Sequence, residues 1–153
     1  MKQGNKNSES LNIFLVRHAE KEKGKDPKLS PEGKIRAIKL GEKLQEIALD
    51  AIYTTDYNRT KETASFANAK QKKTLDLQLY NPRDLEAFAQ EIRKKHSVGQ
   101  TILIVGHSNT TPHLANILTG TEDYPQFEEH DYSNLYLISI KDSNQVNLEQ
   151  LKL

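Results

Sequence analysis

Short apolar segments alternate with longer amphipathic segments along most of this chain, and this alternation constrains the fold more than any other feature. The clearest strand is predicted at 101–105, where every residue is β-branched or apolar, as in a central parallel strand. Further strands are predicted at 13–16, 51–54, 74–77, 135–140 and 146–153, and the last two form an edge hairpin. We therefore expect a three-layer α/β/α sandwich with a mostly parallel central sheet.

Helix signals stand between these strands. Ser30 and Pro31 predict the start of a long helix, because serine caps a helix N-terminus and proline fits its first turn. The apolar face of this helix is expected to consist of Ile35, Ile38, Leu40, Leu44 and Ile47. Other helices are predicted from Asp56, from Pro82 or Asp84 to Lys95, and from Thr111 to Leu118, where Gly120 is a typical terminating residue.

Length and composition indicate one folded domain. With 153 residues, we expect residues 1–10 to be a flexible tail and residues 11–153 to form a single domain. The 22 basic and 21 acidic residues nearly cancel, so no strong overall field attracts nucleic acid or an anionic membrane. No apolar run reaches the roughly 18 to 20 residues that a membrane span requires.

The sequence leaves compartment and assembly open. The absence of cysteine excludes disulfides and thiolate catalysis, and it fits a reducing or an oxidising compartment. The polar N-terminus fits a cytoplasmic protein, and it also fits an exported one whose leader has been removed. Oligomeric state is not predicted.

Basic side chains follow three of the predicted strands. Arg17 and His18 follow the first strand, Arg59 the second, and His107 the central one. Because ligands of open α/β sheets bind beyond the carboxyl ends of the strands, we expect these side chains to share one site. Two guanidinium groups suit the spread negative charge of a phosphoryl group. One imidazole can attack phosphorus while the other donates a hydrogen bond to the developing charge.

The backbone after the central strand fits the same ligand. Gly106 allows a close approach of the chain, and a helix beginning soon after Asn109 would direct N–H groups at an anion. We therefore expect Ser108 and Asn109 to contribute to phosphate binding. Neighbouring arginines would disfavour a charged imidazolium and so keep His18 nucleophilic.

The segment Leu15-Val16-Arg17-His18-Ala19-Glu20 resembles the signature of the histidine phosphatase superfamily, also called phosphoglycerate mutase-like, whose usual form is Arg-His-Gly. Residues 29–33, 50–64 and 105–109 are similar to its other conserved segments and come in the family order. The resemblance extends from about 12 to 140. It implies that His18 is the phosphorylated nucleophile, Arg17 and Arg59 bind phosphate, and His107 is the second pocket histidine. It also implies that no metal or other cofactor takes part.

Two departures bear on the activity. Ala19 replaces the usual glycine and adds a methyl group near the pocket. The mutases of the superfamily are longer and insert a segment with a carboxylate proton donor, whereas this compact chain is more similar to the short phosphohistidine phosphatases. Three acidic residues are the open candidates for a proton donor: Glu20, Asp84 and Glu86.

We therefore expect a phosphatase that acts on a phosphorylated small molecule or a phosphoprotein. The alternatives are a mutase-type phosphotransferase and a non-catalytic phosphate- or phosphoprotein-binding module. A metal held by His18, Glu20 and His107 is disfavoured, because two arginines would repel a cation. The run 21–25 is interpreted as a solvated loop able to attract anions, His113 as a surface or packing residue, and Tyr132 as a packing residue. The substrate's identity is not predicted.

Overall fold

The computed structural model describes residues 9–153, so most of the expected tail lies outside the described residues. The strands are β1 (Ser10–Arg17), β2 (Ala51–Thr54), β3 (Leu77–Leu79), β4 (Thr101–Gly106), β5 (Asn134–Lys141) and β6 (Val146–Lys152). The helices are α2 (Pro31–Leu44), α3 (Asn58–Ala69), α4 (Leu85–Lys95) and α5 (Thr110–Thr119). Among these residues, no helix is long and apolar enough to cross a membrane.

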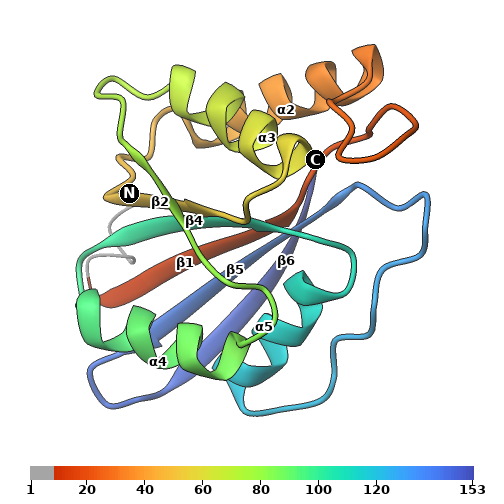
Figure 1. Cartoon of the computed structure of the whole chain (residues 1–153). Helices are drawn as coiled ribbons and strands as arrows, with labels where there is room; N and C mark the ends of the chain where they lie inside the picture. Colours follow the sequence, from red (N-terminus) through yellow and green to blue (C-terminus); the bar gives the residue numbers. More distant parts are fainter. Residues whose placement is uncertain (1–8) are drawn as a thin grey trace.

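The six strands form one mixed sheet in the order β3-β2-β4-β1-β5-β6. The pairs β3/β2, β2/β4 and β4/β1 are parallel, while β5 runs antiparallel to both β1 and β6. Helices α2 and α3 cover one face of the sheet, and α4 and α5 cover the other (Figure 1). The predicted three-layer α/β/α architecture with an edge hairpin is thus confirmed.

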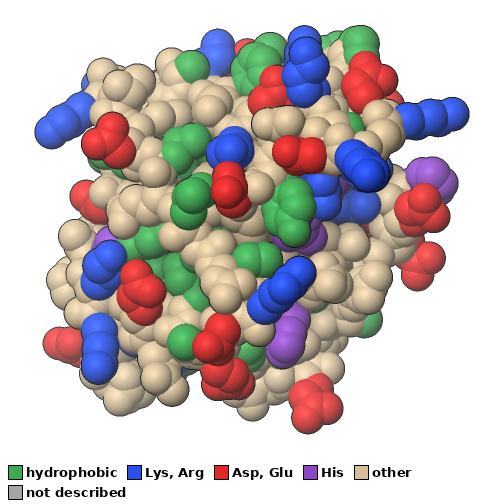
Figure 2. Space-filling model, viewed as in Figure 1, with side chains coloured by type: hydrophobic (Ala, Val, Ile, Leu, Met, Phe, Trp, Pro, Cys, Tyr) green, Lys and Arg blue, Asp and Glu red, His purple; other side chains and the backbone are tan. Residues whose placement is uncertain are grey.

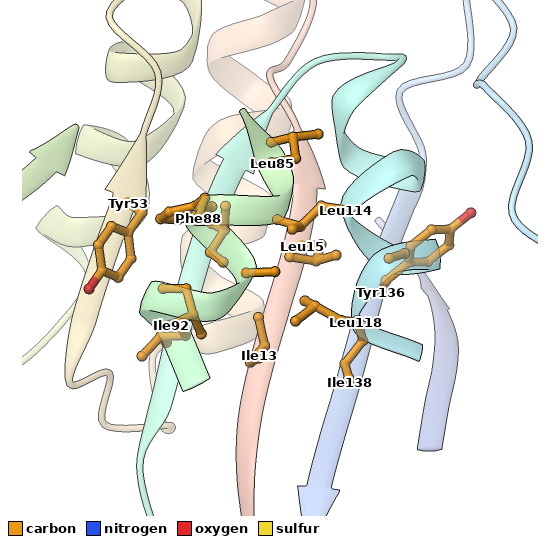
Figure 3. Packing of buried hydrophobic residues seen from close by; sticks show 14 of the residues in the cluster. Ile13, Leu15, Tyr53, Leu85, Phe88, Ile92, Leu114, Leu118, Tyr136 and Ile138 are labelled. Atoms are coloured by element: carbon orange, nitrogen blue, oxygen red, sulfur yellow. The ribbon is translucent and has the colours of Figure 1, made fainter. Parts of the chain in front are cut away.

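Alternation along the central strands divides the core into two layers, because successive strand residues point to opposite faces. In β1, Ile13 and Leu15 pack under α4 and α5, whereas Phe14 and Val16 pack under α2 and α3. Figure 3 shows the first of these layers, in which four side chains point toward the sheet: Phe88 and Ile92 from α4, and Leu114 and Leu118 from α5. Burial on both faces explains why residues 13–16 of β1 and 102–105 of β4 are apolar without a polar alternate.

Two local predictions were wrong. The strand predicted at 74–77 begins at Leu77, because the side chain of Asn68 bonds both the N–H and the carbonyl of Leu75 and so replaces strand pairing there. On α2, Ile35 is 58% exposed. The buried face of α2 instead consists of Gly33, Ala37, Leu40, Gly41 and Leu44, spaced as a helix requires.

The topology brings the ends of distant segments together. β1, β2 and β4 are neighbours and parallel, so the residues that follow them lie at one edge of the sheet. The long connection between α5 and β5 runs down the right-hand side in Figure 1, at this same edge. Phe127 in that connection donates its N–H to the carbonyl of Ser108 over 3.0 Å, which holds it against the end of β4.

Candidate active site

His18 is fixed at the end of β1 by two backbone contacts. Its N–H donates to the carbonyl of Gly106 over 2.9 Å, which joins the ends of β1 and β4. Its Nδ1 lies 2.8 Å from the carbonyl oxygen of Ala19. Because a carbonyl oxygen only accepts, Nδ1 carries the proton and Nε2 keeps its lone pair. His18 is therefore a neutral imidazole with its Nε2 free to act as a nucleophile.

Burial keeps both histidines of the site neutral. The pKa of His18 falls to about 3, chiefly because burial disfavours the charged ring, with Arg17, His107 and Arg59 adding to the effect against the hydrogen bond to Ala19. Burial likewise lowers the pKa of His107 to about 4, with Arg59 and Arg17 contributing. The two rings lie with their centroids 5.6 Å apart, inclined at 68°.

The α5–β5 connection holds Arg17 in place. Its Nη1 donates to the carbonyl oxygens of Glu128, over 3.3 Å, and Asp131, over 2.9 Å. Its Cζ lies 3.9 Å from the centroid of the Tyr132 ring, a cation–π distance. The Arg17 Nε is buried and has no hydrogen-bond partner among the described residues. A buried N–H donor without a partner destabilises the fold, and this one is available to bind an anion.

Arg59 lies on the other side of the site, in the first turn of α3. Its Cζ stands 4.7 Å from the centroid of the Tyr57 ring, and its Nε is likewise buried without a partner in residues 9–153. The Thr63 hydroxyl donates to the Arg59 carbonyl and accepts from the Ala19 N–H. This pair of bonds ties the arginine's helix to the segment of the nucleophile.

A threonine network orients His107. Thr60 donates its hydroxyl proton to the carbonyls of Thr55 and Tyr57, since carbonyl oxygens only accept. The Thr55 hydroxyl then donates to Thr60 and accepts from His107 Nε2, which lies 2.8 Å away. His107 Nδ1 has no partner in the described part of the chain. A bound phosphoryl dianion would raise the His107 pKa and make this nitrogen a donor.

These groups line one open pocket of about 390 Å³. Its walls include Arg17, His18, Arg59, His107, Ser108 and Asn109, together with Lys21, Tyr57, Pro82, Arg83 and Thr110. Figure 2 shows blue Lys and Arg and purple His side chains close together on the right-hand half of this face. Asn109 caps α5 by accepting from the Thr110 N–H, so the positive end of that helix adjoins the pocket. The structure thus brings six of the seven residues predicted for phosphate binding and catalysis, all except Glu20, into one pocket.

The chain matches a family in sequence as well as in arrangement. Residues 13–80, which include Arg17, His18 and Arg59, match the sequence model described as histidine phosphatase superfamily (branch 1). The N-terminal part of this chain is therefore similar in sequence to the histidine phosphatase superfamily. No curated protein matches it significantly by sequence.

Solved structures of low identity share the histidine phosphatase fold. The protein histidine phosphatase SixA in complex with tungstate superposes with a TM-score of 0.75 at 14% identity, over 92% of this chain and 96% of that one. A mycobacterial glucosyl-3-phosphoglycerate phosphatase gives 0.73 at 14% identity, over 92% and 98%. A phosphoglycerate mutase from Plasmodium falciparum gives 0.67 at 19% identity, over 92% and 89%. The likeness in fold therefore extends to phosphatases and to a mutase.

The three candidate proton donors do not line the pocket. Both carboxylate oxygens of Glu20 accept from the Arg36 Nε at 3.0 Å, in a partly buried ion pair. Asp84 caps α4 by accepting from the Ala87 N–H, and Glu86 lines a separate cavity with His113. No carboxylate is among the described residues that line this pocket. Those residues likewise hold no group of three His, Cys, Asp or Glu able to bind a metal ion.

The structure explains the residues at two positions near the site, Ala19 and Gly106. The side chain of Ala19 is 2% exposed and packs with Leu29 and Ala37, so its methyl group is not among the pocket walls. A Cβ on Gly106 would lie 2.7 Å from the Tyr80 hydroxyl and 2.9 Å from the Thr110 Oγ1. Glycine is therefore required there for close packing behind the pocket.

Sequence reasoning missed Tyr132, Tyr57 and Arg83 as contributors to this site, whereas Lys21 belongs to the run 21–25 that is interpreted as a loop able to attract anions. Tyr132, interpreted as a packing residue, stacks on Arg17, and Tyr57 contacts both Arg59 and His107, whose ring centroid is 5.1 Å from its own. Lys21 and Arg83 line the pocket from two different loops. For Tyr57 a signal existed, because it lies two residues before Arg59. Tyr132 and Arg83 are distant in sequence, and only the fold brings them to the site.

Proposed function

We propose that this chain is a metal-independent phosphatase that hydrolyses a phosphomonoester or a phosphoprotein through a phosphohistidine on His18. One observation carries the proposal. A neutral, buried His18 with a free Nε2 shares a pocket with two arginines whose buried Nε donors have no partner in the described chain. An unmet buried donor is unfavourable, and a phosphoryl group between the two guanidinium groups would satisfy both.

The reaction proceeds in two steps. In the first, His18 Nε2 forms a bond to phosphorus while the bond from phosphorus to the leaving oxygen or nitrogen breaks. In the second, a water oxygen attacks phosphorus and the bond from phosphorus to Nε2 breaks. The attacking water loses a proton to solvent, and inorganic phosphate leaves. Arg17, Arg59 and His107 stabilise the charge on the three equatorial oxygens, so catalysis rests on positioning and electrostatics.

The leaving group has to depart without a carboxylic acid in the pocket. Glu20, Asp84 and Glu86 are all engaged or directed elsewhere, so a strongly basic alkoxide would leave slowly. A phenolate is a weaker base, and a phosphohistidine protonated on its ring leaves as neutral imidazole with its own proton. The open pocket and the missing acid therefore favour aryl phosphates and phosphohistidine-containing proteins as the substrate class.

Two other functions are less well supported. A mutase would need a group that protonates the first product and a cover that retains it, and the described walls of this open pocket include no carboxylate. A non-catalytic phosphate-binding module would also lack an acid. It would have no use, however, for a nucleophile kept neutral by burial and oriented by the Ala19 carbonyl.

The test is a single-turnover reaction of a ³²P-labelled aryl phosphate with the full chain in excess chelator, quenched in alkali to preserve phosphohistidine. Wild type should form an acid-labile phosphoenzyme and release phosphate, and His18→Ala should do neither. His113→Ala is the matched control, because this exposed histidine lines a different cavity and its loss should leave labelling unchanged.

Each remaining outcome points to another function. Phosphate binding without label in wild type would favour the binding module. Label that passes to an added alcohol or sugar hydroxyl in preference to water would favour the mutase. Turnover that persists in His18→Ala would exclude the phosphohistidine route.

A further inference from the structure

Two cations of the phosphate pocket are left over once the phosphoryl group is bound. Lys21 and Arg83 both line the pocket, and both are exposed. Neither side chain has a hydrogen bond or ion pair with any residue of 9–153, in which the only ion pairs are Arg36–Glu20, Lys61–Asp56 and Lys95–Glu91. Arg17 and Arg59 already provide the guanidinium groups for one phosphoryl group. The extra positive charge therefore has no assigned role.

Five acidic residues in the loops around the pocket bind other partners. Glu20 binds Arg36, Asp56 binds Lys61 over 2.8 Å, and Asp26 accepts from the Asn58 N–H over 2.8 Å. Asp131 accepts from Ser133 and Asn134, and Asp84 caps α4. None of these five carboxylates thus forms an ion pair with Lys21 or Arg83, although the whole chain carries a formal charge of only +1.

Hydrogen bonds hold the loop that carries Lys21 in a defined conformation. Lys21 forms a β-bridge with Leu29, and the Glu22 N–H donates to the Lys28 carbonyl over 2.8 Å. Asp26 fixes the tip of this loop to the N-terminus of α3, where Tyr57 provides no side-chain cap. Because the loop is anchored at its base and at its tip, the Lys21 stem is held beside the pocket.

The loop that carries Arg83 is anchored in a comparable way. The Tyr80 hydroxyl donates to the Val105 carbonyl over 3.0 Å, and its ring stacks on Phe88 with centroids 4.2 Å apart. The Asn81 side chain accepts from the Arg83 N–H over 2.9 Å, which fixes the turn into α4. Arg83 thus approaches the pocket from the side of α4, while Lys21 approaches from the loop after β1.

We infer that Lys21 and Arg83 form a second anion subsite, which binds a carboxylate or second phosphate on the same substrate as the transferred phosphoryl group. The inference rests on the proposed function for the identity of the first group, the phosphoryl group. It names the substrate class more closely: a phosphorylated compound or peptide segment with another negative charge within reach of the pocket rim.

The test is binding of two non-hydrolysable phosphonates to the full chain by isothermal titration calorimetry. Methylphosphonate occupies the phosphoryl site alone, and 3-phosphonopropionate adds a carboxylate. Wild type should bind the carboxylated compound more tightly, and Lys21→Gln and Arg83→Gln should each reduce this preference about two- to fivefold, as expected for exposed ion pairs. The double variant should bind both compounds equally.

Lys23→Gln is the matched control, because it removes the same charge from an exposed position in the same loop but outside the pocket walls. It should keep the wild-type preference, and all variants should unfold at the wild-type temperature. Equal affinity of wild type for both phosphonates, or a preference that survives in the double variant, would overturn the subsite.

The binding assay also separates this inference from the catalytic proposal. Carboxylate preference without any phosphoenzyme would retain the subsite and reject the phosphatase. Phosphoenzyme formation without carboxylate preference would retain the phosphatase and reject the subsite. If wild type bound neither phosphonate, both would be rejected.

Discussion

Gly33 at the start of α2 lies so close to the backbone of Glu20 that a Cβ atom on Gly33 would overlap the Glu20 carbonyl. The same carbonyl accepts from the Ser30 N–H over 3.0 Å. The first turn of α2 therefore packs directly on the chain two residues beyond His18. The Leu-Ser-Pro-Glu-Gly segment is thus part of the support of the site and not only a helix start.

Gly33→Ala should force these two backbones apart. We expect a loss of about 1–3 kcal/mol in the free energy of unfolding, the usual cost of overpacking, together with weaker binding of inorganic phosphate. Chemical denaturation and calorimetry measure the two effects. Lys34→Ala, at the next and exposed position, is the control and should change neither. Wild-type phosphate affinity in Gly33→Ala would show that the contact does not support the site.

Ala19→Gly, which restores the usual residue of the superfamily signature, should affect stability but not binding. The buried methyl group packs on Leu29 and Ala37, so its loss and the added backbone freedom should cost about 1–2 kcal/mol. Phosphate affinity should stay within about twofold of wild type, because the methyl group does not line the pocket. A large change in affinity with unchanged stability would contradict this assignment.

Tyr132 should position Arg17 through its ring and not through its hydroxyl. Tyr132→Phe keeps the cation–π contact at 3.9 Å and should retain phosphate affinity. Tyr132→Leu removes it and should weaken phosphate binding about three- to tenfold, in line with a cation–π contact of 0.5 kcal/mol or more. Calorimetric titration with inorganic phosphate tests both variants. Equal losses in the two would instead implicate the hydroxyl group.

The lack of a carboxylate in the pocket predicts a strong dependence of rate on the leaving group. Along a series of aryl phosphates, kcat/KM should fall about fivefold or more for each unit of increase in the phenol pKa. Steady-state kinetics at constant pH gives this slope directly. A flat series, with chemistry shown to be rate-limiting, would mean that the protein donates a proton to the leaving oxygen.

Acid should destabilise the fold through the two buried histidines. His18 has a pKa of about 3 in the folded protein against an ordinary 6.5, so the unfolded chain binds more protons between these values. The contribution of neutral His18 to stability is therefore complete above pH 6.5 and is lost as the pH falls. His18→Gln should reduce the fall in free energy of unfolding between pH 6 and 4 by up to about 1.4 kcal/mol per pH unit. Parallel curves for wild type and variant would contradict a lowered pKa.

Local patterns predicted the secondary structure wherever one physical rule dominated. Unbroken apolar runs marked β1 and β4, because both faces of these strands are covered. Ser30 caps α2 by accepting from the Gly33 N–H, and Gly120 ends α5 with a φ of 76°, as predicted. The prediction failed at β3, where the Asn68 side chain competes for the backbone of Leu75. A long-range contact of that kind leaves no mark in the local sequence.

For the site, the sequence by itself determined which chemical groups gather at the carboxyl edge of the sheet. Arg17, His18, Arg59 and His107 each follow a strand, and parallel pairing of β1, β2 and β4 brings such positions together. Only the tertiary structure decided the protonation, the orientation and the hydrogen-bond partners of these groups. The Ala19 carbonyl selects the His18 tautomer, the α5–β5 connection holds Arg17, and Arg36 withdraws Glu20. Spacing along a strand fixes where a side chain starts, whereas its protonation and partners depend on burial and on segments that only folding brings within a few ångströms.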